Sequence, residues 1–150
     1  MPQLQLVSPA FTQGQPIPAR YTADGEDVSP PLAISGAPAG TASFALICDD
    51  PDAPVGTWVH WVVWNLPAGT AHLEEGKLPP GSATGRNSWG RSGWGGPSPP
   101  SGTHRYFFKL FALDTTLELS PATDAKGLER AMSGHVLARA ELMGTYSRRR

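Results

Sequence analysis

The chain has 150 residues, of which 17 are glycine and 16 are proline, more than a fifth of all positions, where average usage is roughly 12 %. So many helix breakers exclude a helical bundle. Hydrophobic residues make up 39 % and charged residues only 17 %, which excludes a disordered chain and predicts one folded domain over residues 1–150. The net charge of −1 gives no bulk field that would attract nucleic acid.

Segments free of breakers and with a period close to two predict β-strands. In chain order they are Leu4–Val7, Leu32–Ser35, Ser43–Asp49, Trp58–Asn65, Thr103–Leu113 and His135–Tyr146. Residues 43–49 are apolar with little alternation, as expected of a strand that is covered on both faces. In the segment from Thr103 the even positions, His104 to Ala112, would face one way, while Arg105 and Lys109 would face the other.

One helix is predicted over Ala122–Met132. Ser120 would be its N-cap, Pro121 suits the first helical position, and Gly134 would end the helix. An internal Gly127 costs about 1 kcal/mol relative to alanine. Several short strands separated by turn clusters predict a mainly β fold, a two-sheet antiparallel Greek-key β-sandwich with one or two short helices.

Residues 79–102 fit no regular element, because half of them are proline or glycine. Loops longer than about 12–15 residues are uncommon in compact domains unless they have a function. This loop contains Trp89 and Trp94, which a spacer would not need. It either shapes a site or forms an Ω-loop that its tryptophans hold against the body.

The candidate polar groups gather at predicted strand ends. They fall in residues 49–54, 57–61 and 95–106. By strand parity, His60 shares a face with Trp58 and Val62. By the same rule, His104 shares a face with Tyr106. If these strand ends meet, they form an apolar pocket that contains two imidazoles, a phenol and nearby carboxylates.

Such a pocket suits an oxyanion. Imidazole and phenol hydrogens donate hydrogen bonds, and a histidine becomes cationic when an anion or a carboxylate favours its protonation. Gly95 and Gly96 would let backbone N–H groups approach phosphate oxygens. Trp58 and Trp94 would form the walls.

The aspartates near the predicted pocket are compatible with other kinds of site. Asp50 or Asp52 would orient a histidine. Alternatively, two histidines and an aspartate could form a facial iron site, although Asp50, His60 and His104 lack the close spacing of such ligands. A small-molecule hydrolase with His60 as base and Asp50 as its orienting group is a further alternative. No nucleophile is visible for such a hydrolase, since Cys48 lies in an apolar run. As the only cysteine of the chain, Cys48 also excludes a disulfide framework.

Neither end of the chain shows a targeting signal. Residues 1–8 lack a basic region before an apolar core, and no stretch approaches the roughly 18 apolar residues of a membrane span. Arg148, Arg149 and Arg150 are too few for a polybasic signal and would form a solvated tail. We therefore expect a cytoplasmic protein without stable membrane insertion.

Several motifs of the sequence are specific. They are YTADG at 21–25, DVSPPL at 27–32, DPDAP at 50–54, WVHW at 58–61, and GGPSPPSGTHRY at 95–106. With these motifs the chain resembles the phosphatidylethanolamine-binding protein family, in its prokaryotic Raf kinase inhibitor-like branch, over essentially its whole length.

This resemblance implies a β-sandwich with a small cavity at one end that accepts phosphate or the head group of phosphatidylethanolamine. Carried over by motif, the ligand-binding residues would be Asp50, Asp52, Trp58, His60, Gly96, Pro99, Pro100, His104 and Tyr106. No catalytic residue, metal or other cofactor is implied. The expected function is non-enzymatic binding of an anion or phospho-ligand, with a kinase or protease as a regulated partner, in a homodimer. Two features depart from the pattern: no long helix follows residues 143–146, and Trp94 stands where a tyrosine often does.

Overall fold

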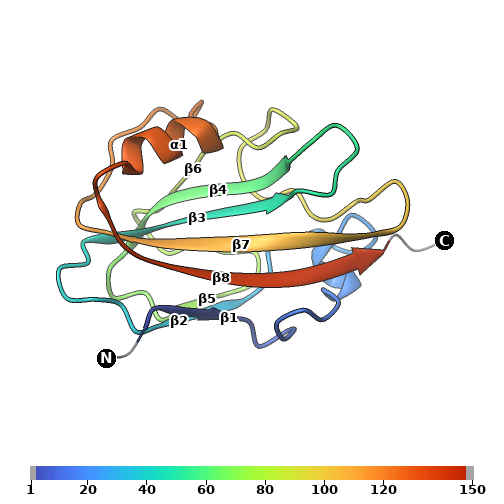
Figure 1. Ribbon diagram of the computed structural model, residues 1–150, viewed down its shortest axis with the longest axis horizontal. Helices are drawn as coiled ribbons and strands as arrows, with labels where there is room; N and C mark the ends of the chain where they lie inside the picture. The colour runs from blue at the N-terminus through green and yellow to red at the C-terminus, as the bar shows by residue number, and fades with distance from the viewer. Residues whose placement is uncertain (1–2, 148–150) are drawn as a thin grey trace.

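The computed structural model describes residues 3–147, which form two antiparallel sheets and one α-helix (Figure 1). The helix covers one face of the larger sheet, and the smaller sheet lies against the other face. The predicted arginine tail at 148–150 lies outside the described residues. Within residues 3–147, no helix has the length and apolar character that crossing a bilayer requires.

The larger sheet has the strand order β6-β4-β3-β7-β8. Its strands are β3 (Ser43–Asp50), β4 (Trp58–Pro67), β6 (Ala83–Thr84), β7 (Thr103–Leu113) and β8 (Val136–Ser147). The smaller sheet has the order β1-β2-β5 and consists of β1 (Gln5–Val7), β2 (Leu32–Ser35) and β5 (His72–Leu73). The predicted mainly β fold with two antiparallel sheets is confirmed. The sequence did not predict β5 and β6, which have only two residues each and therefore no period to detect.

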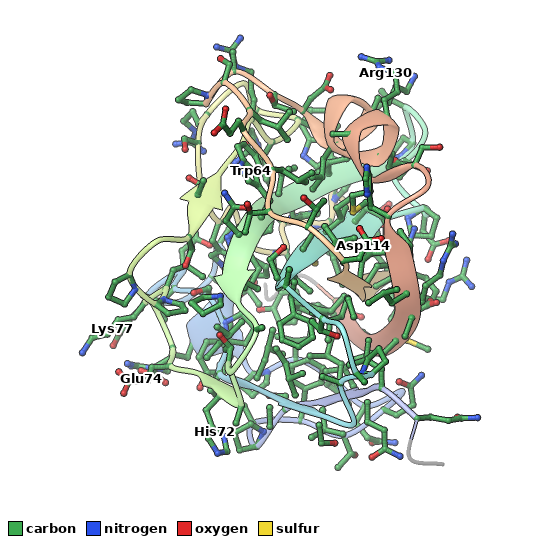
Figure 2. The ribbon with its side chains drawn as sticks, turned by 90° about the vertical axis from the view of Figure 1, so that its left-hand side faces the viewer. Trp64, His72, Glu74, Lys77, Asp114 and Arg130 are labelled. Atoms are coloured by element: carbon green, nitrogen blue, oxygen red, sulfur yellow. The ribbon has the colours of Figure 1, made fainter. Side chains whose placement is uncertain are left out.

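Two apolar clusters hold the layers together. The first fills the space between the sheets, and the even positions of β7, including Phe108 and Leu110, are buried in it as predicted. The second lies between the larger sheet and the helix, where Trp64 packs with Leu128. Figure 2 shows Trp64 on the helix side of the sheet, with His72 at the opposite side of the molecule. Fully burying a leucine such as Leu128 stabilises the fold by roughly 1.5–3 kcal/mol.

The helix α1 (Ala125–Met132) begins three residues later than predicted. Its N-cap is Asp124, whose Oδ1 accepts a hydrogen bond of 2.9 Å from the Gly127 N–H. Ser120, the predicted cap, instead accepts from the N–H of Ala122 in a separate turn. The prediction was wrong at this end because the segment holds two capping residues four positions apart, and the one directly before Ala125 is used.

Strand β4 carries an extra residue at His60. Cys48 of β3 pairs with Trp61, but the next residue, Asp49, pairs with Val59, so His60 has no partner in the ladder. Such a β-bulge turns consecutive side chains to the same face. His60 therefore shares its face with Trp61, and the prediction that it shares a face with Val62 was wrong: Val62 packs in the cluster under α1.

The long loop between β6 and β7 is anchored to the edge of β4. Backbone N–H groups of Gly85, Ser88 and Gly95 donate to carbonyls of β4 at 2.9–3.0 Å. The loop thus extends the sheet edge without forming a strand and returns across the end of the sandwich. Its tip closes over the ends of β3, β4 and β7.

Candidate functional site

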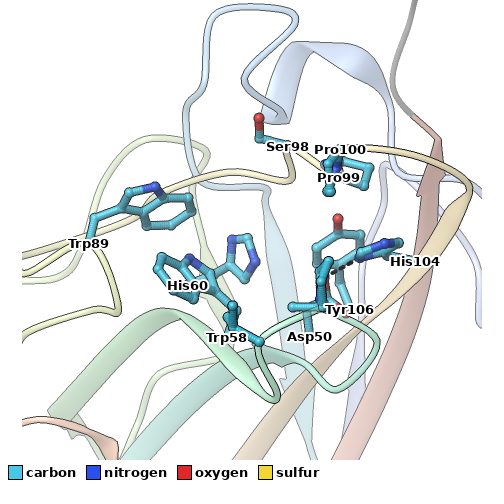
Figure 3. Close-up of a pocket in the computed structure, with 12 residues that line it drawn as sticks. Asp50, Trp58, His60, Trp89, Ser98, Pro99, Pro100, His104 and Tyr106 are labelled. Carbon is cyan, nitrogen blue, oxygen red and sulfur yellow. Dashed lines mark hydrogen bonds and ion pairs between the residues drawn. The ribbon is translucent and has the colours of Figure 1, made fainter.

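A cavity of about 220 Å³ lies at the end of the larger sheet (Figure 3). Its lining comes from the end of β3, the β3–β4 turn, the start of β4, the long loop and the start of β7. The lining residues are Asp50, Ala53, Pro54, Val55, Trp58, His60, Trp89, Ser98, Pro99, Pro100, His104 and Tyr106. Seven of the nine residues predicted for the site meet here; Asp52 and Gly96 do not.

Asp50 and His104 form a buried pair on one side of the cavity. The His104 Nδ1 lies 2.7 Å from the Asp50 Oδ2, and the two residues are only 6 % and 3 % exposed. The other Asp50 oxygen accepts from the N–H of Asp52 at 2.8 Å, which holds the carboxylate in place. Because Nδ1 donates to a carboxylate, the imidazole is fixed in orientation and its Nε2 is left for another partner. The orienting group is therefore Asp50.

His60 lies on the opposite side of the cavity from this pair (Figure 3). Its Nδ1 lies 2.6 Å from the Gly95 carbonyl oxygen, so Nδ1 carries a hydrogen and donates. The ring packs edge-on against Tyr106 and Trp89, with centroids 5.1 and 5.0 Å apart. Burial among these rings lowers the pKa of His60 below its ordinary value. The histidine is thus neutral near pH 7.

Tyr106 lies between the two histidines. It is 1 % exposed, and its hydroxyl has no hydrogen-bond partner among the residues that the structure describes. Burial raises the pKa of this phenol, and the negative charge of Asp50 adds to the effect. The hydroxyl therefore stays protonated. Leaving a buried donor unpaired costs about 1–3 kcal/mol, which marks this position as one where a partner is expected.

Asp52, which the resemblance placed in the site, is turned away from it. Its carboxylate forms a bidentate ion pair with Arg105, in which Oδ2 lies 2.9 Å from Nε and Oδ1 lies 2.8 Å from Nη2. This guanidinium lowers the pKa of Asp52 to about 2. Arg105 occupies an odd position of β7, which faces away from the cavity, and Asp52 follows it to that side.

The two glycines do not offer their N–H groups to a ligand as expected. The Gly95 N–H donates to the His60 carbonyl at 3.0 Å, and the Gly96 N–H donates to the Asp27 Oδ1 at 2.8 Å. Glycine is needed here for space. A Cβ on residue 95 would lie 2.4 Å from the Trp89 ring, and one on residue 96 would lie 2.3 Å from Asp27. These residues position the loop and do not line the cavity.

The expected wall residue Trp94 is replaced by Trp89. Trp94 stacks on Phe108 at 5.9 Å and packs against the core between the sheets. Trp89 packs edge-on against Trp58 at 5.5 Å, and both line the cavity. The sequence singled out both loop tryptophans, but it could not show which of them lines the cavity and which packs against the core. Ser98 and residues 53–55 were not predicted, although they adjoin motif residues that were.

The alternatives drawn from the sequence find little geometric support. Within residues 3–147, no group of three or more His, Cys, Asp and Glu side chains is placed to hold a metal ion. Cys48 is fully buried, and burial raises the pKa of its thiol well above the ordinary value. The arrangement offers instead two fixed imidazoles and one unpaired phenol hydroxyl around a small apolar cavity.

The chain is similar to proteins of a known family. Residues 7–147 match the family model described as phosphatidylethanolamine-binding protein. A UPF0098 protein of Methanothermobacter thermautotrophicus is 51 % identical over 150 residues, which cover 97 % of this chain and 99 % of the relative. A UPF0098 protein of Aquifex aeolicus is 47 % identical, over 97 % of this chain and 89 % of the relative.

Two solved structures share the fold. The crystal structure of a putative phosphatidylethanolamine-binding protein homolog from Chlamydia trachomatis superposes with a TM-score of 0.95 at 40 % identity, covering 99 % of this chain and 100 % of the other. The structure of E. coli YbcL, described as a new member of the mammalian family, gives a TM-score of 0.91 at 32 % identity, covering 98 % and 99 %. On sequence and fold alike, the chain belongs to the phosphatidylethanolamine-binding protein family.

Proposed function

We propose that this protein binds a small phosphate-type anion in the cavity and does not transform it. The observation that carries the proposal is the buried Tyr106 hydroxyl, a donor with no partner within residues 3–147, which faces the cavity between two histidines. An oxyanion supplies the acceptor that this donor lacks. The Nε2 of His104 donates a second hydrogen bond when the ring is protonated.

The size and charge of the cavity define the ligand further. Its volume of about 220 Å³ is below the roughly 300–1,000 Å³ of sites for drug-sized molecules, so it fits a head group. The negative charge of Asp50 offsets that of a protonated His104, 2.7 Å away. A cavity with so little net positive charge favours a monoanion over a dianion.

A binding role is favoured over catalysis because neither histidine contacts a nucleophile. The His60 ring bonds the Gly95 carbonyl and the His104 ring bonds the Asp50 carboxylate, and neither group is a hydroxyl or a thiol. General-base activation of a serine, threonine or cysteine requires such a contact. Without it, turnover of phosphate esters is not expected.

Phosphate titration by calorimetry tests the proposal. Wild type should bind inorganic phosphate, and His104→Ala should bind it about 10–150-fold more weakly, the equivalent of losing one hydrogen bond to a charged group. His135→Ala is the matched control, because its Nδ1 also lies 2.8 Å from an aspartate, Asp114, but on the surface. Equal affinity of wild type and His104→Ala, or no binding by wild type, would overturn the proposal.

A second candidate is regulation of a protein partner, such as a kinase or protease, whose phosphorylated side chain enters the cavity. The observation that favours it is the apolar mouth, where Val55 is 80 % and Trp89 37 % exposed. A phosphopeptide should then bind more tightly than free phosphate, and Val55→Ser should reduce only the phosphopeptide affinity. Equal affinities for the two ligands would contradict this candidate.

A further inference from the structure

A second cleft lies beside the long loop, where residues 27–29 and 76–78 approach β4 and β6. It shares no lining residue with the cavity at the end of the larger sheet. Its lining includes Asp27, Val28, Trp61, Lys77, Leu78 and Trp94. The volume of the second cleft is about 360 Å³, and sites for small organic molecules have roughly 300–1,000 Å³, so it is large enough for one.

Trp94 lines the second cleft and carries a hydrogen-bond donor without a partner. Its Nε1–H is buried and bonds no group within residues 3–147. The ring is held in place, because it stacks on Phe108 with centroids 5.9 Å apart and packs edge-on against Trp61 with centroids 5.4 Å apart. Leaving a buried donor unpaired is unfavourable, so a ligand that brings an acceptor to this ring gains affinity.

Asp27 brings a carboxylate to the second cleft. Its Oδ1 accepts from the Gly96 N–H at 2.8 Å, and its own N–H donates to the Arg20 carbonyl at 3.0 Å, so the residue is fixed in position. Its Oδ2 has no hydrogen bond or ion pair with a residue that the structure describes. Burial raises the pKa of Asp27, and the Gly96 N–H and the charge of Arg91 oppose this effect only in part. The carboxylate would therefore be stabilised by a cation at Oδ2.

The second cleft also has an apolar surface and an ammonium group at its rim. Val28 and Leu78 are half-buried and pack against the core between the sheets. Lys77 pairs with Glu74 at 3.5 Å on the surface, where Figure 2 shows both side chains. Such an exposed pair contributes little, so the ammonium group can exchange its partner for a ligand. The cleft thus combines an anionic acceptor, a neutral donor and a cation around an apolar wall.

We propose that the second cleft binds a small zwitterion with an apolar side chain, of the α-amino acid class. The ammonium group of the ligand donates to the Asp27 Oδ2. Its carboxylate accepts from the Trp94 Nε1–H and faces Lys77, while its side chain lies against Val28 and Leu78. An anion without an ammonium group would be repelled by Asp27, and a cation without a carboxylate would leave the Trp94 donor unpaired. This site is independent of the function proposed above.

Three compounds with the same branched side chain test the proposal. Leucine is the zwitterion, isocaproate lacks the amine, and isopentylamine lacks the carboxylate. Leucine should bind at least about tenfold more tightly than either of the others, the equivalent of one hydrogen bond to a charged group. Side-chain ¹⁵N spectra measure the binding. The Trp94 indole signal, identified by its absence in Trp94→Phe, should move to lower field with leucine, while that of Trp64 under α1 should not move.

Asp27→Asn tests the contact with the ammonium group. The variant keeps the Oδ1 to which the Gly96 N–H donates and removes only the charge. Leucine and isocaproate should then bind within about twofold of each other. Asp114→Asn is the matched control, because Asp114 is a surface aspartate outside the cleft, and it should keep the wild-type ratio.

The outcomes separate this inference from the proposed function. Absence of leucine binding, equal binding of leucine and isocaproate by wild type, or an unmoved Trp94 signal overturns the inference. Displacement of leucine by inorganic phosphate also overturns it, because leucine would then occupy the cavity at the end of the sheet. Failure of phosphate to bind, with leucine bound as expected, refutes the proposed function and leaves the zwitterion site intact.

Discussion

Replacing Tyr106 with phenylalanine should stabilise the free protein while weakening phosphate binding. The unpaired, 1 % exposed hydroxyl costs about 1–3 kcal/mol, and phenylalanine removes it while keeping the ring packed against His60 at 5.1 Å. A cavity of about 220 Å³ has room for water that offsets part of this cost, so we expect a gain near the lower end, about 1 kcal/mol. For a chain of this length that corresponds to a rise in Tm of about 2–4 °C.

Urea unfolding in phosphate-free buffer measures the gain as a higher midpoint with an unchanged m value. Calorimetry should show phosphate affinity falling roughly 10–150-fold, as for one lost hydrogen bond to a charged ligand. Tyr21→Phe is the control of opposite sign, because the Tyr21 hydroxyl donates to the Glu75 Oε1 at 3.0 Å and its loss should destabilise the fold. A lower midpoint for Tyr106→Phe, or unchanged phosphate affinity, would refute the reasoning.

Three further predictions test the corrections to the site and the helix. Gly96→Ala should destabilise the fold by more than about 1 kcal/mol, because its Cβ would lie 2.6 Å from a backbone oxygen, whereas Gly69→Ala, with nothing within 4 Å, should be nearly neutral in the same urea unfolding assay. Asp124→Ala should lower stability by about 1 kcal/mol through loss of the N-cap bond, while Ser120→Ala should change it by less than half as much; similar losses would contradict the assignment of the cap. Asp52→Asn should leave phosphate affinity within twofold and lower stability at pH 7 by less than about 1 kcal/mol. Since ion pairing lowers the pKa of this carboxyl from 3.8 to about 2, its contribution is present above pH 4 and lost as the pH falls toward 2, so wild type and variant should converge there in acid unfolding.

The sequence alone predicted which side chains share a face wherever polar and apolar residues alternate along a strand. In β7 the polar and apolar positions alternate, so the shared face of His104 and Tyr106 could be predicted from period alone, and the structure buries both. The pairing of Asp50 with a histidine followed from chemistry, because a buried carboxylate and an imidazole at neighbouring strand ends satisfy each other. Which histidine it meets depended on the strand order.

Long-range contacts decided what the sequence did not predict. The partner of the Gly96 N–H is Asp27, 69 residues away, and no local pattern connects them. The bulge at His60 was hidden because its neighbours in β4 are apolar on both faces, so that a change of parity leaves no trace in hydropathy. Trp89 lines the cavity in place of Trp94 because of the way the loop is hydrogen-bonded to the edge of β4.

The bulge at His60 divides β4 into a part that lines the cavity and a part that packs the core. From Trp61 to Trp64, the side chains of β4 alternate between the two apolar clusters, and a shift there would turn core residues outward. Trp58 and His60 lie before Trp61 and line the cavity, while Val59 between them packs against the cluster under α1. Substitutions of Trp58 and His60 alter which ligand is accepted without disturbing the sandwich, so relatives of this fold can diverge in ligand chemistry while retaining the same core.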